Sequence, residues 1–371
     1  MPEYVPLKVS DPNLLFDATG KRPIVGMTHE EMAAFLEELG EPKFRAKQLF
    51  QWVYQKGAKS FDQMTNLPAG LRHKLEERAM VALLEDEVEQ HADPTRTTKF
   101  LFRMLDGQKV ESVLMKHDYG NSVCVTTQVG CRMGCTFCAS TFGGLVRNLT
   151  AGEIVDQIVM MQQHLLEGER VSSVVLMGSG EPMENYDEVL KAVRLMHDPE
   201  GLNIGYRHIT VSTSGLVPAM RRLADENIPI TLALSLHAAT DELRSELMPV
   251  ARIWPVAEVL AAAREYGEKT GRRVTYEYIL IEEVNDKPEQ AAELSQLLHG
   301  SLAHVNLIPM NPVAERPQYR RPARERVIAF RDILEEHGIT ATIRREMGGD
   351  IDAACGQLRN RVARKRGAAR S

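Results

Sequence analysis

The sequence predicts an α/β protein with a parallel sheet at its centre, and three observations support this prediction. From residue 121 to about residue 345, short apolar runs typical of buried strands alternate with stretches of helical periodicity. About six such strand–helix units predict an incompletely closed (β/α)6 barrel. Glycine-containing polar segments follow several of the apolar runs, as loops at the carboxyl ends of barrel strands do.

The first 92 residues predict a smaller accessory domain. Residues 1–26 contain four prolines and little periodicity, so we expect an extended arm. Residues 27–92 are expected to form a helical domain, because Thr28 and Glu31 make a capping box and apolar residues recur at helical spacing. The expected helices run from Thr28 to Gly40, from Lys43 to Gln55 and from Leu71 to Ala79. Their lysines are typical of a solvated helix face, and a surface that contacts phosphate groups is the alternative.

A β-hairpin is expected over residues 93–120. Lys99–Met104 and Lys109–Met115 are strand-like runs, and the Asp106–Gly107 pair between them is a turn signal. Glu111 falls in the second strand, where its spacing assigns it no role.

The barrel segment, residues 121–345, contains seven apolar runs with helical patterns between them. The expected strands are Val123–Thr127, Val174–Met177, Ile209–Ser212, Ile230–Ser235, Val274–Ile281, Val305–Ile308 and Ile339–Ile343. The expected helices span about 150–165, 188–197, 217–225, 256–267, 288–299 and 324–338. The active site of such a barrel forms at the carboxyl ends of its strands.

The composition is that of a soluble globular chain. Lys and Arg number 45 against 51 Asp and Glu, a net charge of -6, so any nucleic-acid surface must be local. The chain lacks a basic, apolar leader and any run of about 18 apolar residues, so we expect a cytoplasmic protein that does not enter a membrane. Five cysteines, mostly clustered, do not resemble a secreted disulfide framework.

Four of the five cysteines lie between residues 124 and 138, and Cys131, Cys135 and Cys138 form a C-x3-C-x2-C pattern. Thiolates this close select an iron–sulfur cluster, zinc or copper(I). A structural zinc site wants four protein ligands, and the nearest histidines lie outside this loop, which leaves only a distant fourth ligand. A four-iron cluster held by three cysteines leaves one iron open to a substrate.

This spacing, with an aromatic residue just before the third cysteine, resembles the radical S-adenosylmethionine (SAM) enzymes. The resemblance implies a [4Fe-4S] cluster whose open iron binds the amino and carboxylate groups of SAM, which is cleaved to a 5′-deoxyadenosyl radical. Four polar segments at strand ends would line the mouth where SAM binds: Gly178–Pro182, Ser212–Gly215, Ser235–His237 and Asn306–Pro312. Their glycines allow a close backbone approach, and Glu181 can accept a hydrogen bond from an ammonium group.

The C-terminal segment, residues 346–371, carries a further resemblance around Cys355. Two segments, Ile343–Glu346 and Gly349–Leu358, together look like the C-terminal signature of the RlmN family. The members of this family are dual-specificity adenine-C2 methyltransferases of 23S rRNA and tRNA. Other segments that resemble this family are Gln128–Cys131, Arg207–Gly215, Ser235–Ala238 and Val305–Pro309. Ser179 departs from the methionine usual in the family's Gly-Met-Gly-Glu-Pro loop, while Gly180 and Glu181 remain.

The resemblance implies a role for each site residue. Cys355 takes a methyl group from one SAM, a second SAM supplies the radical that activates this methyl group, and the resulting methylene radical adds to C2 of adenine. Cys124 then forms a transient disulfide with Cys355, and Glu111 accepts the C2 proton. The implied cluster ligands are Cys131, Cys135 and Cys138, and the implied SAM contacts are Gly180, Glu181, Ser212, Ser235, Leu236, His237 and Asn311. From its strand pattern alone, Cys124 is equally a buried strand residue.

The resemblance also implies partners: 23S rRNA at the peptidyl-transferase centre, tRNA at the adenosine 3′-adjacent to the anticodon, and an electron donor such as a flavodoxin-type reductant. The protein is expected to be a monomer. Basic residues at 316–326 and 359–370 could supply local phosphate contacts. Two alternatives stay open: a Cfr-type enzyme that methylates C8 of the same rRNA nucleotide, and a non-catalytic iron–sulfur protein that binds RNA or senses redox state.

Overall fold

The computed structural model describes residues 20–92, 96–311, 313 and 315–344. Cys355 and the rest of the C-terminal segment lie outside these described residues, as do residues 1–19 of the expected arm. Within the described ranges, none of the helices has the length and apolar character needed to cross a membrane.

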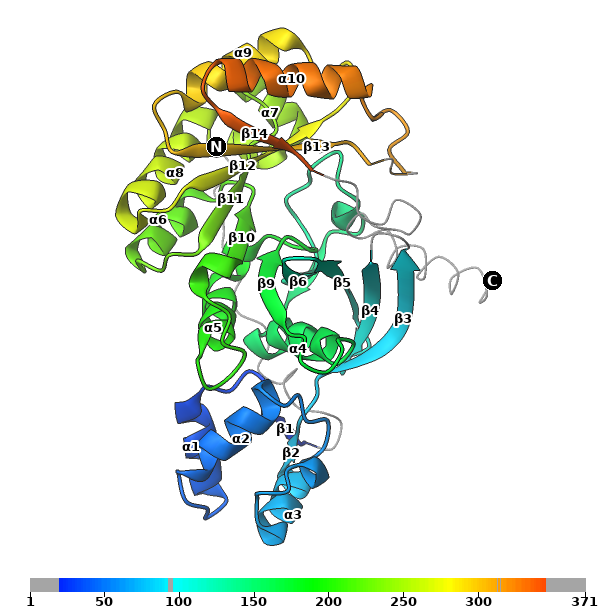
Figure 1. Ribbon diagram of the computed structural model, residues 1–371, viewed down its shortest axis with the longest axis vertical. Helices are drawn as coiled ribbons and strands as arrows, with labels where there is room; N and C mark the ends of the chain where they lie inside the picture. The colour runs from blue at the N-terminus through cyan, green and yellow to red at the C-terminus, as the bar shows by residue number, and fades with distance from the viewer. Residues whose placement is uncertain (1–19, 93–95, 312, 314, 345–371) are drawn as a thin grey trace.

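A ten-stranded sheet forms the centre of the molecule, in the order β14-β13-β12-β11-β10-β9-β6-β5-β4-β3. Its first seven strands are mutually parallel, which confirms the predicted partial barrel. These strands are β6 (Gly120–Cys124), β9 (Val171–Leu176), β10 (Ile209–Thr213), β11 (Thr231–Ser235), β12 (Val274–Leu280), β13 (Ala303–Pro309) and β14 (Thr340–Ile343). The sheet curves, and its two edge strands lie apart in Figure 1.

Each pair of neighbouring parallel strands is joined through a helix on the outer side of the sheet (Figure 1). The crossover helices are α4 (Ala151–Gln162), α5 (Tyr186–His197), α6 (Val217–Asp225), α8 (Val256–Thr270), α9 (Pro288–Leu298) and α10 (Arg324–Glu336). Two features were not expected from the sequence: a short helix α7 (Asp241–Leu247) after β11, and the hairpin of β7 (Gln128–Gly130) and β8 (Leu145–Asn148) that brackets the cysteine loop.

Three antiparallel strands extend the sheet beyond β6: β5 (Lys109–His117), β4 (Thr97–Met104) and β3 (Leu84–Ala92). Strands β4 and β5 form the predicted hairpin, and Asp106 accepts a hydrogen bond from the Gln108 N–H in its turn at 2.9 Å. The helical domain is expected over residues 27–92, but residues 84–92 form strand β3 of the central sheet. Four acidic residues hide this strand's pattern, and charge on an edge strand is a common guard against aggregation.

The N-terminal part contains the three predicted helices, α1 (His29–Glu38), α2 (Arg45–Tyr54) and α3 (Ala69–Arg78). The capping box is confirmed, since Glu31 N–H donates to Thr28 Oγ1 at 3.3 Å and Thr28 N–H donates to Glu31 at 2.8 Å. The end of the expected arm is not loose. Strand β1 (Arg22–Pro23) pairs with β2 (Ala79–Met80), and the next two side chains, Ile24 and Val25, are buried.

The N-terminal segment packs directly against helix α4. Gly26 and Gly152 meet so closely that a Cβ on Gly152 would lie 2.5 Å from the Val25 carbonyl oxygen. Asp156, also on α4, accepts hydrogen bonds from the N–H groups of Leu83 and Leu84 at 2.7 and 3.0 Å. Burial raises the pKa of Asp156 to about 7. Helix α4 therefore contacts the chain on both sides of the accessory helices, at residues 25–26 and at residues 83–84.

Gly152→Ala should weaken this contact, because the new methyl group must displace the Val25 backbone. Overpacking of this kind costs about 1–3 kcal/mol, so we expect the midpoint of thermal unfolding to fall by several degrees. Gly70→Ala is the matched control: Gly70 lies in α3, and a Cβ there meets nothing within 4 Å. Equal midpoints for the two variants would contradict the proposed tight packing.

Candidate active site

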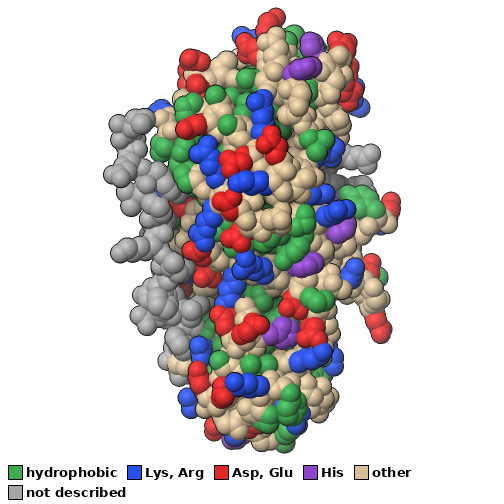
Figure 2. Space-filling view, turned by 90° about the vertical axis from the view of Figure 1, so that its left-hand side faces the viewer, with side chains coloured by type: hydrophobic (Ala, Val, Ile, Leu, Met, Phe, Trp, Pro, Cys, Tyr) green, Lys and Arg blue, Asp and Glu red, His purple; other side chains and the backbone are tan. Residues whose placement is uncertain are grey.

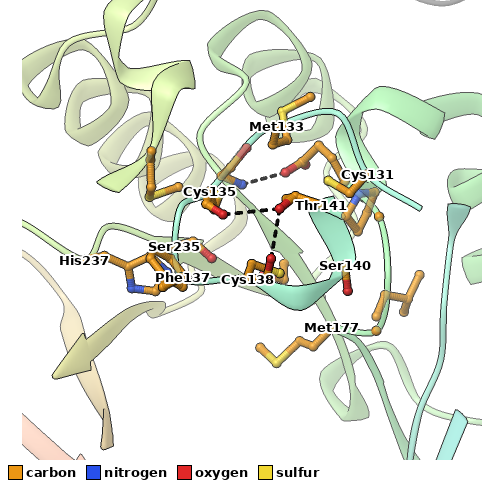
Figure 3. A pocket seen from close by; sticks show the side chains of 18 residues that line it. Cys131, Met133, Cys135, Phe137, Cys138, Ser140, Thr141, Met177, Ser235 and His237 are labelled. Carbon is orange, nitrogen blue, oxygen red and sulfur yellow. Dashed lines mark hydrogen bonds between the residues drawn. The ribbon is translucent and has the colours of Figure 1, made fainter. Parts of the chain in front are cut away.

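The cysteine loop lies between β6 and α4, at the carboxyl edge of the sheet. Cys131, Cys135 and Cys138 line one pocket (Figure 3). The Thr141 hydroxyl donates to the carbonyl oxygens of Cys138 and Cys135 at 2.9 and 3.4 Å, which fixes the turn between them. Gly130 has φ of +83°, and a Cβ there would lie 2.0 Å from the carbonyl oxygen of Gly144, just before β8. Only glycine fits this position.

The three thiols are close enough to affect one another, yet too far apart for a single small ion. Burial raises the pKa of each thiol, that of Cys131 to about 12, and the thiols of Cys131 and Cys138 raise the pKa of Cys135 further. Among the described residues, these cysteines are not in any group of three ligand atoms within 4.8 Å of one another. A zinc ion about 2.3 Å from each sulfur would need sulfur–sulfur distances of about 3.8 Å. The arrangement fits a larger centre, such as a four-iron cluster.

The polar segment after β9 lies across the pocket from the cysteine loop. Gly180 has φ of +112°, and a Cβ there would lie 2.7 Å from the Gln128 side chain. The buried carboxylate of Glu181 accepts hydrogen bonds from the N–H groups of Ser214 and Met183 at 2.7 and 3.0 Å. Burial raises the pKa of Glu181. Glu181 therefore ties the end of β9 to the end of β10 and also faces the pocket.

Five of the seven predicted SAM contacts line this same pocket: Gly180, Glu181, Ser212, Ser235 and His237. Leu236 is fully buried and Asn311 lies in the loop after β13; neither lines the pocket. The structure thus brings the ends of β9, β10 and β11 to the cysteine loop, which follows β6. None of the described residues after β13 lines this pocket.

His237 is held as a neutral ring. Its Nδ1 accepts a hydrogen bond from the Ile279 N–H at 3.0 Å, which leaves the proton on Nε2. Burial, and to a smaller extent Arg244, lowers the pKa of His237 to about 3. The ring of Phe137 packs edge-on against it with centroids 5.0 Å apart (Figure 3). The site therefore presents an N–H donor at this corner and no imidazolium.

Arg244, on α7, is a site residue that the sequence motifs do not mark. Its guanidinium is fully buried and donates to the carbonyl oxygens of Ser214 and Leu236 at 2.7 and 3.1 Å. It thereby joins the ends of β10 and β11. The carbonyl of Leu247, the last residue of α7, accepts a hydrogen bond from the Thr136 N–H at 2.9 Å, so the same helix also holds the cysteine loop. In the sequence, Arg244 looks like any polar residue of a short helix.

A second group of functional candidates lies on β4, β5 and β6. Lys99 and Glu111 form a buried ion pair, with Nζ 2.8 Å from Oε2. Lys99 pairs with Val113, and Val113 with Cys124, so Lys99 and Cys124 project from the same face of the sheet. The Cys124 sulfur accepts a hydrogen bond from the N–H of Met177, a residue that lines the cysteine pocket.

Comparisons with known proteins identify this arrangement. The "Ribosomal RNA large subunit methyltransferase N-terminal domain" matches residues 23–81, and the "Radical SAM superfamily" matches residues 125–295. A protein of Symbiobacterium thermophilum named "Probable dual-specificity RNA methyltransferase RlmN" is 76% identical over 362 residues, 98% of each chain. A protein of the same name from Pelotomaculum thermopropionicum is 53% identical and covers 92% of this chain and 94% of its own. The chain belongs to the RlmN family.

A solved structure supports the RlmN assignment at the level of the fold. The crystal structure of a radical SAM methyltransferase from Sphaerobacter thermophilus is similar with a TM-score of 0.88 and 48% identity, over 90% of this chain and 98% of that one. Membership of the radical SAM superfamily implies a [4Fe-4S] cluster and SAM, and the three-cysteine pocket fits such a cluster.

The Ser179 departure leaves the backbone of this RlmN chain well connected. The Ser179 carbonyl oxygen accepts hydrogen bonds from the N–H groups of Thr127 and Gln128 at 3.0 and 3.2 Å. Its own N–H donates to Thr126 Oγ1 at 3.2 Å. Because backbone atoms make these contacts, the position of Gly180 and Glu181 does not depend on a methionine at residue 179.

Arg244→Met should loosen the site of this RlmN protein. The change leaves buried carbonyl oxygens without a donor, which costs at least about 2 kcal/mol and lowers the thermal unfolding midpoint by about 4 °C or more. We also expect weaker SAM binding, measured by equilibrium dialysis on cluster-loaded protein. Arg252→Met, an exposed arginine just beyond the same helix, is the control. If both variants melt and bind alike, Arg244 does not hold the strand ends.

Proposed function

We propose that this chain is a radical-SAM methyltransferase that methylates C2 of adenosine in 23S rRNA, at the peptidyl-transferase centre, and in tRNA, 3′-adjacent to the anticodon. The observation that carries the proposal is the meeting of Cys131, Cys135 and Cys138 with Glu181 and His237 in one pocket. Family membership adds the RNA substrates, because the relatives are named as dual-specificity RNA methyltransferases.

In this proposal two sets of residues bind the cluster and SAM, and five of the seven residues in the second set line the pocket. Cys131, Cys135 and Cys138 hold the cluster, and Gly180, Glu181, Ser212, Ser235, Leu236, His237 and Asn311 position SAM. The cluster and SAM, when bound, supply the 5′-deoxyadenosyl radical. The buried Glu181 carboxylate and the Nε2–H of His237 offer an acceptor and a donor to a zwitterionic ligand. Two SAM molecules are consumed per turnover, one as methyl donor and one as radical source.

The proposed methyl transfer uses three further residues. Cys355 carries the methyl group to adenine, Glu111 accepts the proton that leaves C2, and Cys124 forms a disulfide with Cys355 to release the product. The burial of Glu111 and Cys124 on the strands next to the pocket supports these roles. A flavodoxin-type reductant supplies electrons, and the protein acts as a monomer in the cytoplasm, where thiols stay reduced.

Local charge suggests where RNA approaches. The basic loop after β13 contacts the cysteine loop. The Arg316 guanidinium carbon lies 5.0 Å from the Phe142 ring centroid, and the Tyr319 hydroxyl donates to Thr136 Oγ1 at 2.7 Å. Ion pairs occur on both surfaces: Lys47 and Lys74 of the accessory helices pair with Glu200 and Glu41, and Arg320 of the basic loop pairs with Glu282. The basic loop differs in lying against the cysteine loop. On the face shown in Figure 2, basic and acidic side chains are interspersed. We therefore place the RNA phosphates near the loop at residues 315–321.

Nucleoside mass spectrometry tests the function. Undermodified rRNA and tRNA are incubated anaerobically with reconstituted protein, SAM and a reductant, and 2-methyladenosine is expected in both. Cys355→Ala should form none, because it lacks the methyl-carrying thiol. Formation of 8-methyladenosine would instead establish the Cfr-type reaction. An intact cluster that cleaves no SAM would favour a non-catalytic iron–sulfur protein.

Iron analysis tests the ligand set separately. Cys131→Ala, Cys135→Ala and Cys138→Ala should each lose most of the about four iron atoms that reconstituted protein binds. Cys124→Ala is the matched control, because this thiol also lies at the carboxyl end of the first barrel strand, and it should keep its iron. Iron loss in Cys124→Ala, or full iron in any of the other three, would overturn the assignment.

A further inference from the structure

The buried Lys99–Glu111 pair lies beside Cys124, and the proposed function gives Lys99 no role. Lys99, Val113 and Cys124 form one row across three neighbouring strands, and Glu111 precedes Val113 by two residues on the same face. Two strand spacings put the Cα atoms of Lys99 and Cys124 about 10 Å apart, within reach of a long lysine side chain. Lys99 and Glu111 are 1% and 6% exposed, so water screens their charges little.

The surroundings of Cys124 are otherwise unfavourable to a thiolate. Burial raises the pKa of its thiol, and the negative charge of Glu111 raises it further. Arg344, which follows β14, the Met177 N–H and Lys99 act in the opposite direction and lower this pKa. Among the described residues, the charged side chains that act on this thiol are Arg344 after β14, Lys99 on β4 and Glu111 on β5.

The proposed release step uses both neighbours of Lys99, Glu111 and Cys124. Glu111 takes the proton that leaves C2 of the radical adduct, and the one electron that the reductant supplied to generate the radical leaves the adduct as well, so that a closed-shell thioether remains. The Cys124 sulfur then forms a bond to the Cys355 sulfur as the bond from that sulfur to the methylene carbon breaks. The electron pair of the broken bond stays on the carbon, which takes up one proton, equivalent to that of the Cys124 thiol, and becomes the methyl group.

We propose that Lys99 is a positioning residue that couples these two events. While Glu111 is ionised, the Lys99 ammonium neutralises it and holds it in place. Once Glu111 has taken the C2 proton, the charge of Lys99 is no longer balanced by it and favours the Cys124 thiolate. Loss of the C2 proton therefore adds the charge of Lys99 to the stabilisation that Arg344 and the Met177 N–H already give the Cys124 thiolate. This inference rests on the roles proposed for Glu111 and Cys124.

A site-resolved alkylation experiment tests the coupling without methyl transfer. Full-length, cluster-loaded protein is treated with iodoacetamide over a range of pH, and mass spectrometry reports the midpoint for Cys124; the midpoint reflects the thiol pKa, whereas the plateau rate reflects access. Glu111→Gln mimics the protonated carboxyl and should lower the midpoint by about one unit. Adding Lys99→Met should reverse that shift. This double variant removes both charges, so it leaves neither of them buried and unpaired.

A trapping experiment tests the consequence during turnover. Unmodified tRNA transcript is incubated with each variant, and a denaturing gel separates the protein–RNA adduct from free methylated RNA. Lys99→Met should raise the adduct-to-product ratio about tenfold, the change in thiolate fraction that one pKa unit gives. Lys99→Arg should restore release. Lys109→Met, which breaks the ion pair between Lys109 on β5 and Glu87 on β3, should partition like the wild type.

Failure of the Lys99 coupling and failure of the proposed function give different results. The coupling is wrong if Glu111→Gln and Glu111→Gln with Lys99→Met titrate together, or if Lys99→Met partitions like the wild type. A purely structural Lys99 would lower stability and total turnover without changing either the midpoint or the ratio. If the wild type and Cys124→Ala give neither adduct nor methylated adenosine, the proposed function fails, and the alkylation midpoints still decide whether Lys99 acts on Cys124.

Discussion

The parallel pairing of the barrel strands is the constraint on which the site depends. In a parallel sheet, every strand presents its carboxyl end at the same edge, so loops that are far apart in the sequence meet there. The register from β6 through β9 and β10 to β11 places the cysteine loop, Glu181, Ser212 and Ser235 around one pocket. The end of β9 also packs closely against the chain after β6: a Cβ on Gly178 would lie 2.6 Å from the Val125 carbonyl oxygen.

The inner face of the barrel carries a buried polar pair on β12 and β13. On β12, Tyr276 and Tyr278 are buried on the helix-covered face, and Tyr278 packs on Phe330 of α10. Glu277 lies between them and faces the other way, where Asn306 donates to its carboxyl group at 2.7 Å. Burial raises the pKa of Glu277 to about 7. Buried polar groups of this kind cost stability unless they are paired, so the interior is built for ligands and charge more than for stability.

The sequence marks the residues that line the pocket better than the residues that hold the pocket together. The C-x3-C-x2-C spacing and the polar strand ends need only local sequence, and the pocket contains the three cysteines with five of the seven predicted contacts. Arg244 has no such signal, because its burial comes from where α7 packs and not from helical periodicity. Strand β3 and residues 22–26 are missed for related reasons: acidic residues mask the alternation in one, and in the other a two-residue strand is too short to give a pattern.

The position of Cys124 explains why four clustered cysteines divide into three and one. Cys131, Cys135 and Cys138 are on a loop whose turns direct them into the pocket, whereas Cys124 is the last residue of β6 and its direction is set by the pairing with Val113 and Val175. Its sulfur is held by the Met177 N–H, and burial keeps its pKa raised. Burial raises the pKa of the three pocket cysteines as well, so the direction of the side chain separates Cys124 from them, and acidity does not. The same burial means that Cys124 needs a nearby positive charge at the moment it reacts, and Lys99 is the buried ammonium on the same face of the sheet.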